Sequence, residues 1–245
     1  MSDMIKLMKS HVSVRSFTDE VIPEEHLKEI LEAGQAASSW KNFQSYSIIK
    51  VRSQETKQAI YDLESQHWIK TCDTFLLMVG DLNRAKVAVD LHSASFYPEG
   101  VENLLISSVD AALVGQNILL AAESLGYGGV MIGMVRQSSE GLAELLNLPE
   151  YTYPIFGIAL GVPKKHNPIK PRLPLETVVF DEKYRVADSQ VIHDFDAVQT
   201  AYAGARQTEL WSERIVQQFG QPESPVTEHY LKKQKLLRSE DQASM

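Results

Sequence analysis

The chain has 245 residues, of which 44% are hydrophobic and 23% charged, an ordinary composition for a globular protein with a sizeable core. Its 24 basic and 32 acidic residues leave a formal net charge of −8. An acidic chain without a basic block is a poor nucleic-acid binder, because neutralisation of phosphates dominates that affinity. Any anionic ligand must therefore be held by a local cluster of donors.

Cys72 is the only cysteine, so the chain forms no intramolecular disulfide, as is typical of a reducing compartment. The first residues lack the basic and apolar regions of a signal peptide, and the apolar run over residues 75–79 is too short to span a bilayer. We therefore expect a cytoplasmic protein with neither a membrane nor a nucleic acid as partner. Cys72 follows a predicted helix and precedes a predicted buried strand, which favours a packed, inert thiol over a nucleophile.

The first predicted element is a short helix over residues 4–9, and the stretch that follows, residues 11–17, contains side chains that bind anions. His11 offers an imidazole, Ser13 a hydroxyl and Arg15 a guanidinium, with backbone N–H groups between them. These donors make the stretch a candidate anion site. Taken alone, it also fits a solvated basic loop.

Pro23 favours the start of a helix, and Leu27, Ile30 and Leu31 have the spacing of a buried helix face. Residues 36–39 are small and polar, which allows a flat ligand to approach closely. A plain helix end fits these four residues equally well.

Residues 46–51 are predicted to form a strand, and Ser53 is suited to cap the helix that follows. Residues 66–70 favour one more helical turn. Residues 74–80 are almost continuously apolar, which predicts a central strand buried on both faces. A further helix is predicted over residues 81–92.

Residues 102–125 form the longest helical pattern and are apolar on most sides. Such a helix lies either at the centre of a domain or at the seam of a dimer, and we expect it to do both. The glycine-rich residues 126–133 follow this helix and precede a strand, whereas a dinucleotide-binding fingerprint follows a strand and opens a helix. Gly126 is therefore expected to end the helix, and Gly133 to let a ligand approach the backbone.

The last buried strand is predicted over residues 153–161, and a basic, proline-rich segment follows it. Residues 178–180 favour an edge strand. Farther along, apolar residues are too sparse for a separate core. We therefore expect one domain over the whole chain, residues 1–245, with a main body at 1–186 and a C-terminal arm at 187–245 that wraps the body or a neighbouring subunit.

Hydrolytic and metal-binding motifs are absent from the sequence, which contains no Gly-x-Ser-x-Gly, no His-Glu-x-x-His and no Cys/His ligand spacing. We therefore predict no catalytic side chain and no metal site. Cationic groups near both ends of the chain, combined with stretches of small residues, suit a planar cofactor that carries a phosphate and brings its own chemistry.

Several separated motifs then point to one family. They are His11-x-Ser13-Val14-Arg15-x-Phe17-Thr18-Asp19-Glu20, Ala37-Ser38-Ser39, Ser47-Ile48-Ile49, Ala121-Ala122-Glu123-Ser124-Leu125-Gly126-x-Gly128-Gly129-Val130-x-Ile132-Gly133 and Lys170-Pro171-Arg172-Leu173-Pro174. In this order they resemble the oxygen-insensitive nitroreductase and flavin reductase family, specifically its NADPH-dependent, FMN-containing group. The resemblance covers residues 4–175 and continues loosely to the end.

The resemblance implies an α+β fold in which helices flank a mostly antiparallel central sheet. It also implies a homodimer with crossed C-terminal arms, whose interface holds two FMN molecules. Its motifs assign the FMN phosphate to His11, Ser13 and Arg172, and the ribityl chain and the N1/O2 side of the ring to Arg15 and Lys170. The complete implied FMN site is His11, Val12, Ser13, Val14, Arg15, Ser38, Ser39, Gln66, Met131, Ile132, Gly133, Met134, Lys170 and Arg172.

The implied activity is the transfer of hydride from NADPH to flavin N5, followed by reduction of nitroaromatics, quinones, free flavins or similar acceptors in a ping-pong cycle. Hydride transfer requires no protein acid or base. Arg206 is the only match to the family's NADPH-phosphate loop, and Glu209 lies nearby, so NADPH is expected as the donor with NADH possible. The alternative is a flavin-binding regulatory or binding protein without turnover.

Overall fold

The computed structural model describes residues 2–165, 167–206 and 209–238. The chain forms two compact units, Met1–Asn167 with Pro225–Met245 and Pro168–Ser224. The expected boundary at residue 187 differs from this division, because the second unit begins earlier and the chain then returns to the first. It returns through α10 (Val226–Lys233), whose Tyr230 and Leu231 are buried in the core of the first unit.

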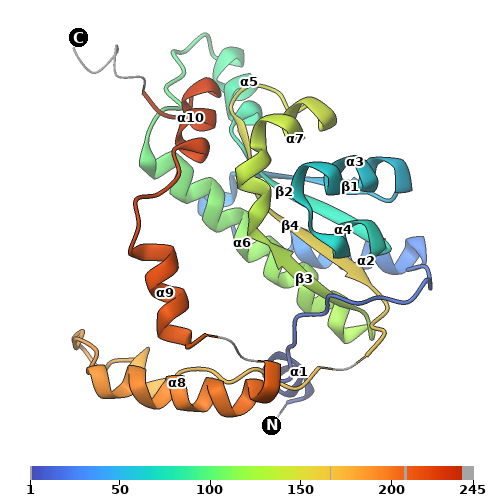
Figure 1. The fold of residues 1–245 in the computed structure, drawn as a ribbon. Coiled ribbons are helices and arrows are strands. Elements are labelled where there is room, and N and C mark those ends of the chain that lie inside the picture. The colour runs from blue at the N-terminus through green and yellow to red at the C-terminus, as the bar shows by residue number, and fades with distance from the viewer. Residues whose placement is uncertain (1, 166, 207–208, 239–245) are drawn as a thin grey trace. The chain divides into compact units, whose positions relative to one another are not determined.

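The first unit is built on a four-stranded antiparallel sheet in the order β1-β2-β4-β3 (Figure 1). The strands are β1 (Tyr46–Val51), β2 (Thr74–Asp81), β3 (Gly128–Ile132) and β4 (Thr152–Gly161). The two central strands, β2 and β4, are buried along their whole length, which explains their apolar composition. The antiparallel sheet and the central strand predicted from residues 74–80 are confirmed.

One irregularity in β4 accommodates a proline inside this central strand. Met78 pairs with Phe156 and Val79 with Pro154, so Ile155 is an extra residue opposite β2. Proline has no N–H to donate to a ladder, and a bulge is one of the few places where a sheet tolerates it.

Helices surround the sheet. They are α1 (Asp3–Lys9), α2 (Glu24–Gln35), α3 (Gln54–Glu64), α4 (His67–Thr71), α5 (Asn83–Leu91), α6 (Val101–Ser124) and α7 (Ser139–Leu146), with 3-10 turns η1 (Trp40–Asn42) and η2 (Gly133–Ser138). Ser53 caps α3 as predicted, by accepting the Thr56 N–H at 3.3 Å.

Apolar side chains of the sheet alternate between two core clusters. Leu76 and Met78 belong to the cluster that includes α2 and α6, whereas Phe75 and Leu77 belong to the cluster that includes α3 and α4. Successive side chains of a strand point to opposite faces, so one apolar run supplies both cores. The result is a sheet with helices packed on each face.

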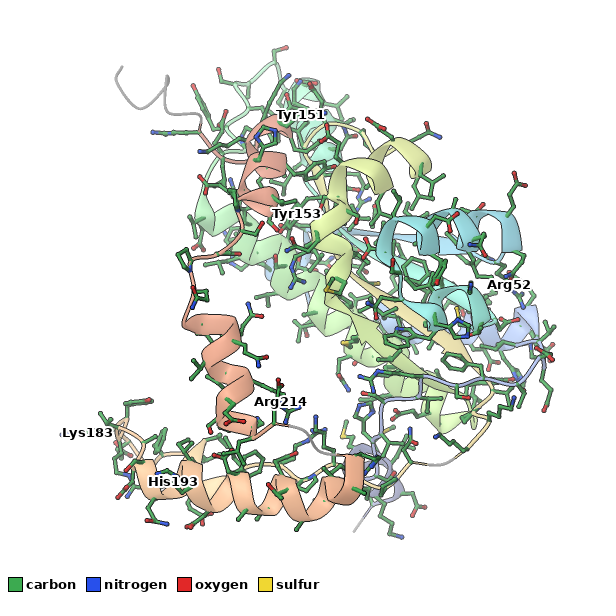
Figure 2. All side chains as sticks on the ribbon, in the orientation of Figure 1. Arg52, Tyr151, Tyr153, Lys183, His193 and Arg214 are labelled. Atoms are coloured by element: carbon green, nitrogen blue, oxygen red, sulfur yellow. The ribbon has the colours of Figure 1, made fainter. Side chains whose placement is uncertain are left out.

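The longest helix, α6, is held closely against α2 and the sheet. A Cβ atom at Gly34 of α2 would lie 2.4 Å from the Cγ1 atom of Ile118, so these helices approach too closely for any larger residue there. The Tyr153 hydroxyl of β4, labelled in Figure 2, lies 2.9 Å from Ser107 Oγ and 2.8 Å from Ser108 Oγ on α6. By length and composition α6 could cross a membrane. One face of α6 packs in the core of the first unit and contains the buried Asp110, whereas another face is exposed.

The second unit contains η3 (Leu175–Thr177), α8 (Ser189–Ala203), η4 (Gly204–Arg206) and α9 (Trp211–Phe219). The edge strand expected over residues 178–180 is wrong, because the chain turns at η3 and does not pair with a strand there. Asp196 of α8 is buried and accepts hydrogen bonds from the Ser212 N–H at 2.9 Å and the Ser212 hydroxyl at 2.6 Å. These bonds lower the pKa of Asp196 and join the first turn of α9 to α8.

A buried carboxyl at the end of α3 makes stability depend on pH. Both oxygens of Glu64 are buried without a hydrogen-bond partner among the described residues, and burial raises the pKa of this carboxyl above 4.5. The nearby Ser138 hydroxyl, which donates to the Leu63 carbonyl at 3.0 Å, lowers this pKa by less than burial raises it. The folded protein therefore binds the proton more tightly than the unfolded chain, and stability falls as pH rises between the two pKa values.

Replacing Glu64 by Gln removes this titration. Near pH 4 the variant should match the wild type, and its stability relative to the wild type should increase as the pH rises toward neutrality, because only the wild-type carboxyl loses a proton there. Urea unfolding across this range measures the difference. Glu29→Gln, at an exposed position of α2, is the matched control and should show no such trend. A Glu64→Gln variant with the wild-type pH profile would contradict the argument.

Candidate functional site

The predicted anion-binding stretch is an extended segment fixed along the edge strand β3 (Figure 1). The Val14 N–H donates to the Gly129 carbonyl at 2.8 Å, and the Ser13 carbonyl accepts from the Asn167 side chain at 3.1 Å. Val14 is buried, whereas Arg15 is exposed. Because successive side chains of an extended segment point to opposite sides, Val12 and Val14 pack against the core, and His11, Ser13 and Arg15 lie on the other side of the backbone.

The polar side chains of this segment contact two helices. His11 Nδ1 lies 2.5 Å from Glu123 Oε1, near the C-terminal end of α6. The guanidinium carbon of Arg15 lies 5.6 Å from the ring centroid of Trp68 in α4, a cation–π contact. Gln66, another predicted site residue, is the N-cap of α4 and is half-buried. The fold thus brings Arg15 close to the helix that Gln66 begins.

The end of β3 contains both exposed and buried apolar side chains. Met131 is 38% exposed and Met134 is 50% exposed, whereas Ile132 is 3% exposed and packs in the core. Gly133 begins η2. The two methionines therefore remain candidates for side-chain contact with a ligand, and Ile132 can take part only through its backbone.

Ser38 and Ser39 lie in a loop that a buried carboxylate of α6 holds in place. Asp110 is 1% exposed and accepts hydrogen bonds from the Trp40 N–H at 2.8 Å and the Ser45 N–H at 3.1 Å. Ser39 Oγ accepts the Gln44 N–H at 3.3 Å.

The backbone between these anchor points is strained. The φ angles are 48° at Lys41, 59° at Asn42 and 53° at Gln44, values that side-chain-bearing residues rarely adopt. Such a conformation persists only where the surroundings impose it, and the Asp110 hydrogen bonds at both ends of the loop do so.

Three predicted site residues belong to the second unit. Lys170 and Arg172 lie in a segment whose backbone is tied to α8, since Gln199 donates to the Pro171 carbonyl at 3.2 Å and the Tyr202 hydroxyl donates to the Pro168 carbonyl at 3.0 Å. Arg206 follows α8, and its guanidinium donates to the carbonyls of Ala203 and Tyr202 at 3.2 and 3.1 Å. Residues 207 and 208 of the expected NADPH loop lie outside the described residues.

The predicted site residues of the first unit form two groups that different elements hold in place. His11 and Arg15 are joined to β3, α4 and the end of α6, whereas the loop with Ser39 is joined to the middle of α6. The roles of Asp110, Glu123 and Trp68 were not predicted from the sequence. Acidic residues inside an otherwise apolar helix were the available signal for the first two, because a buried carboxylate requires donors from elsewhere.

Comparison with known proteins identifies the family. A sequence model of the nitroreductase family matches residues 8–162, and a model of the C-terminal domain of the nitroreductase family matches residues 170–239. The chain belongs to the nitroreductase family. The predicted resemblance and the nitroreductase-like fold class are thereby confirmed.

Relatives of this nitroreductase-family chain cover nearly its full length. It is 38% identical over 243 residues to the FMN reductase [NAD(P)H] of Bacillus subtilis, covering 96% of this chain and 98% of the relative. It is 34% identical over 240 residues to the oxygen-insensitive NADPH nitroreductase of Salmonella typhimurium, with the same coverage of 96% and 98%. The structure of the NADPH:FMN oxidoreductase from Vibrio harveyi complexed with NAD+ superposes with a TM-score of 0.89 at 31% identity, covering 97% of this chain and 100% of that chain.

The carboxylate that holds the strained loop provides a test. Asp110→Asn replaces one of the two acceptor oxygens with an NH2 group, which cannot accept a hydrogen bond, so one of the Trp40 and Ser45 N–H groups loses its acceptor. The substitution should lower the free energy of unfolding by about 2–3 kcal/mol. Amide hydrogen exchange at Trp40 and Ser45 should accelerate. Asp90→Asn, which removes only an exposed pair with Lys86, should change stability by less than about 0.5 kcal/mol. Unchanged exchange at both amides would contradict the assignment.

Proposed function

We propose that this protein is an FMN-dependent oxidoreductase that oxidises NADPH, or less effectively NADH, and reduces small-molecule acceptors such as nitroaromatics, quinones and free flavins. The observation that carries the proposal is the donor set of His11, Ser13 and Arg15, fixed along β3 in a chain that belongs to the nitroreductase family. Relatives named as an FMN reductase and an NADPH nitroreductase support it.

The chemistry of this donor set fits FMN. An imidazole, a hydroxyl and a guanidinium within five residues suit a phosphate, and the small residues near Ser38 and Gly133 leave room for a planar ring. When bound, FMN supplies the hydride-accepting and electron-donating chemistry. The chain supplies the rest: donors for the phosphate from residues 11–15, the cation of Arg15, the surface of Met131 and Met134, and the further cations Lys170 and Arg172.

The proposal includes a ping-pong order, in which the nicotinamide nucleotide leaves before the acceptor binds, and a cytoplasmic location. It includes no nucleic-acid or membrane partner. A flavin-binding regulatory protein without turnover is the second candidate, and measurement of NAD(P)H oxidation separates the two.

We also propose a homodimer with crossed C-terminal arms, supported by apolar surfaces of each unit. On α6, Val101, Leu105, Val109 and Leu113 follow one another at intervals of four residues and are 44–65% exposed. A groove of about 1410 Å³ in the first unit has a partly apolar lining that includes residues of α2, β1 and α5. On α9, Ile215, Val216 and Phe219 are exposed. Exposed apolar surfaces of this extent are typical of interaction sites.

The cofactor and the turnover are tested together. The purified protein should be yellow, and anaerobic addition of NADPH should bleach the flavin absorbance near 450 nm. Subsequent addition of a quinone should restore it. A colourless protein that also fails to take up added FMN would overturn the proposal, and bound FMN without any NAD(P)H oxidation would favour the regulatory alternative.

The dimer is tested by sedimentation. Wild-type protein should sediment as a dimer at micromolar concentration, and Leu105→Glu should shift it toward monomer, because a charge would be buried in the interface. Val21→Glu, at an exposed apolar position outside the groove lining and outside α6, is the control and should remain dimeric. A stable, flavin-loaded wild-type monomer would contradict the proposed assembly.

Arg206 is proposed to bind the 2′-phosphate of NADPH. Loss of one charge-assisted hydrogen bond costs about 1.5–3 kcal/mol, so Arg206→Ala should raise the KM for NADPH by roughly 10- to 150-fold and leave NADH kinetics and FMN content nearly unchanged. Arg214→Ala, at an exposed arginine of the same unit (Figure 2), serves as the control. If Arg206→Ala weakens both nucleotides equally, the residue only caps α8 through the carbonyls of Ala203 and Tyr202.

A further inference from the structure

The pair formed by His11 and Glu123 joins the anion-binding segment to the core helix. The Nδ1–Oε1 distance is 2.5 Å, and the side chains of His11 and Glu123 are only 22% and 11% exposed. Two groups this sheltered interact strongly, because water screens their charges poorly. A carboxylate in such a position needs donors to offset the loss of its hydration.

The second oxygen of Glu123 increases the need of this carboxylate for a hydrogen-bond donor. Glu123 Oε2 is buried and has no hydrogen-bond partner among the described residues. His11 is therefore the compensating group that the described part of the chain offers to this carboxylate. The bond has one consistent direction for an ionised Glu123: Nδ1 carries the proton and donates it to Oε1.

The protonation of Nδ1 has a consequence at the other ring nitrogen. In a neutral ring with its proton on Nδ1, Nε2 has a lone pair and would oppose a phosphate oxygen. In the imidazolium form both nitrogens donate, one to Glu123 and the other to an anion on the far side of the ring. The contact of Nδ1 with Glu123 therefore leaves Nε2 as the ring nitrogen that can face an anion.

We propose that Glu123 is a positioning residue for flavin nucleotide binding: it holds the His11 ring with Nδ1 on its carboxylate, so that Nε2 is the ring nitrogen presented to the phosphate. Glu123 acts only through His11, since its carboxylate lies behind the ring. The inference rests on the proposed function, and it assigns to Glu123 a contribution specific to the phosphate end of the cofactor.

The test separates the phosphate from the ring system by comparing two ligands. Apoprotein variants are titrated with FMN and with riboflavin, which lacks the phosphate, and flavin fluorescence reports each Kd. Glu123→Gln retains an acceptor for Nδ1–H and removes the charge. It should weaken FMN by about 10-fold or more, the range for losing a charge-assisted hydrogen bond, and change riboflavin by less than about 2-fold.

A double-mutant cycle tests whether Glu123 acts through His11. His11→Gln should weaken FMN to a similar extent, and the double variant should be no weaker than His11→Gln alone. Glu102→Gln, at an exposed position in the first turn of α6, is the matched control and should bind both ligands as the wild type does. Circular dichroism and urea unfolding of each variant establish that it is folded.

The outcomes are distinct. Equal weakening of FMN and riboflavin by Glu123→Gln, or additive effects in the cycle, would overturn the positioning role while leaving the proposed function intact. Wild-type apoprotein that binds neither flavin would overturn the proposed function itself, and this inference with it. Weakening confined to FMN and absent from the His11→Gln background supports the inference.

Discussion

The candidate site depends on two carboxylates that α6 carries into a largely apolar environment. Asp110, in the middle of the helix, accepts the N–H groups of Trp40 and Ser45, and Glu123, near its end, pairs with His11. A carboxylate buried without donors costs several kcal/mol, so each one dictates where distant segments must lie. One rigid helix therefore positions both the strained loop and the anion-binding segment.

The sheet supplies the platform for this arrangement. Its central strands separate two apolar clusters, and α6 is fixed to it through the buried Tyr153 hydroxyl. β3 is an edge strand, and an uncovered edge offers unpaired backbone groups to other chains. The segment around Val14 covers part of that edge by donating to Gly129. The same hydrogen bond that protects the edge also fixes the backbone of His11, Ser13 and Arg15, the donors that we propose bind the flavin nucleotide.

The second unit is stabilised differently. Its described helices are joined by polar contacts, with Asp196 bound to the first turn of α9 and Gln199 and Tyr202 bound to the proline-rich segment. Few of its apolar side chains are buried, and Phe219 remains 78% exposed. A unit with so little core is expected to be only marginally stable by itself, which supports the proposal that it associates with a second subunit.

The local sequence pattern was enough to predict the main core elements and the candidate hydrogen-bond donors. The apolar run over residues 74–80 and the long apolar helix specified the core, because burial on both faces leaves a continuous apolar signature. The hydrogen-bonding groups of His11, Ser13 and Arg15 could also be identified from sequence, because a side chain's capacity to donate hydrogen bonds is a property of the residue type. The assignment of those residues to FMN stays a prediction.

Tertiary structure decided what depends on distant partners. The role of Asp110 arises from amides some 65 and 70 residues away, and that of Glu123 from a histidine 112 residues away, so no local periodicity reports them. The edge strand expected over residues 178–180 failed because a strand requires a partner, and sequence pattern describes only the segment itself. The return of the chain through α10 escaped prediction likewise, since its few apolar residues are buried only against a core formed much earlier in the chain.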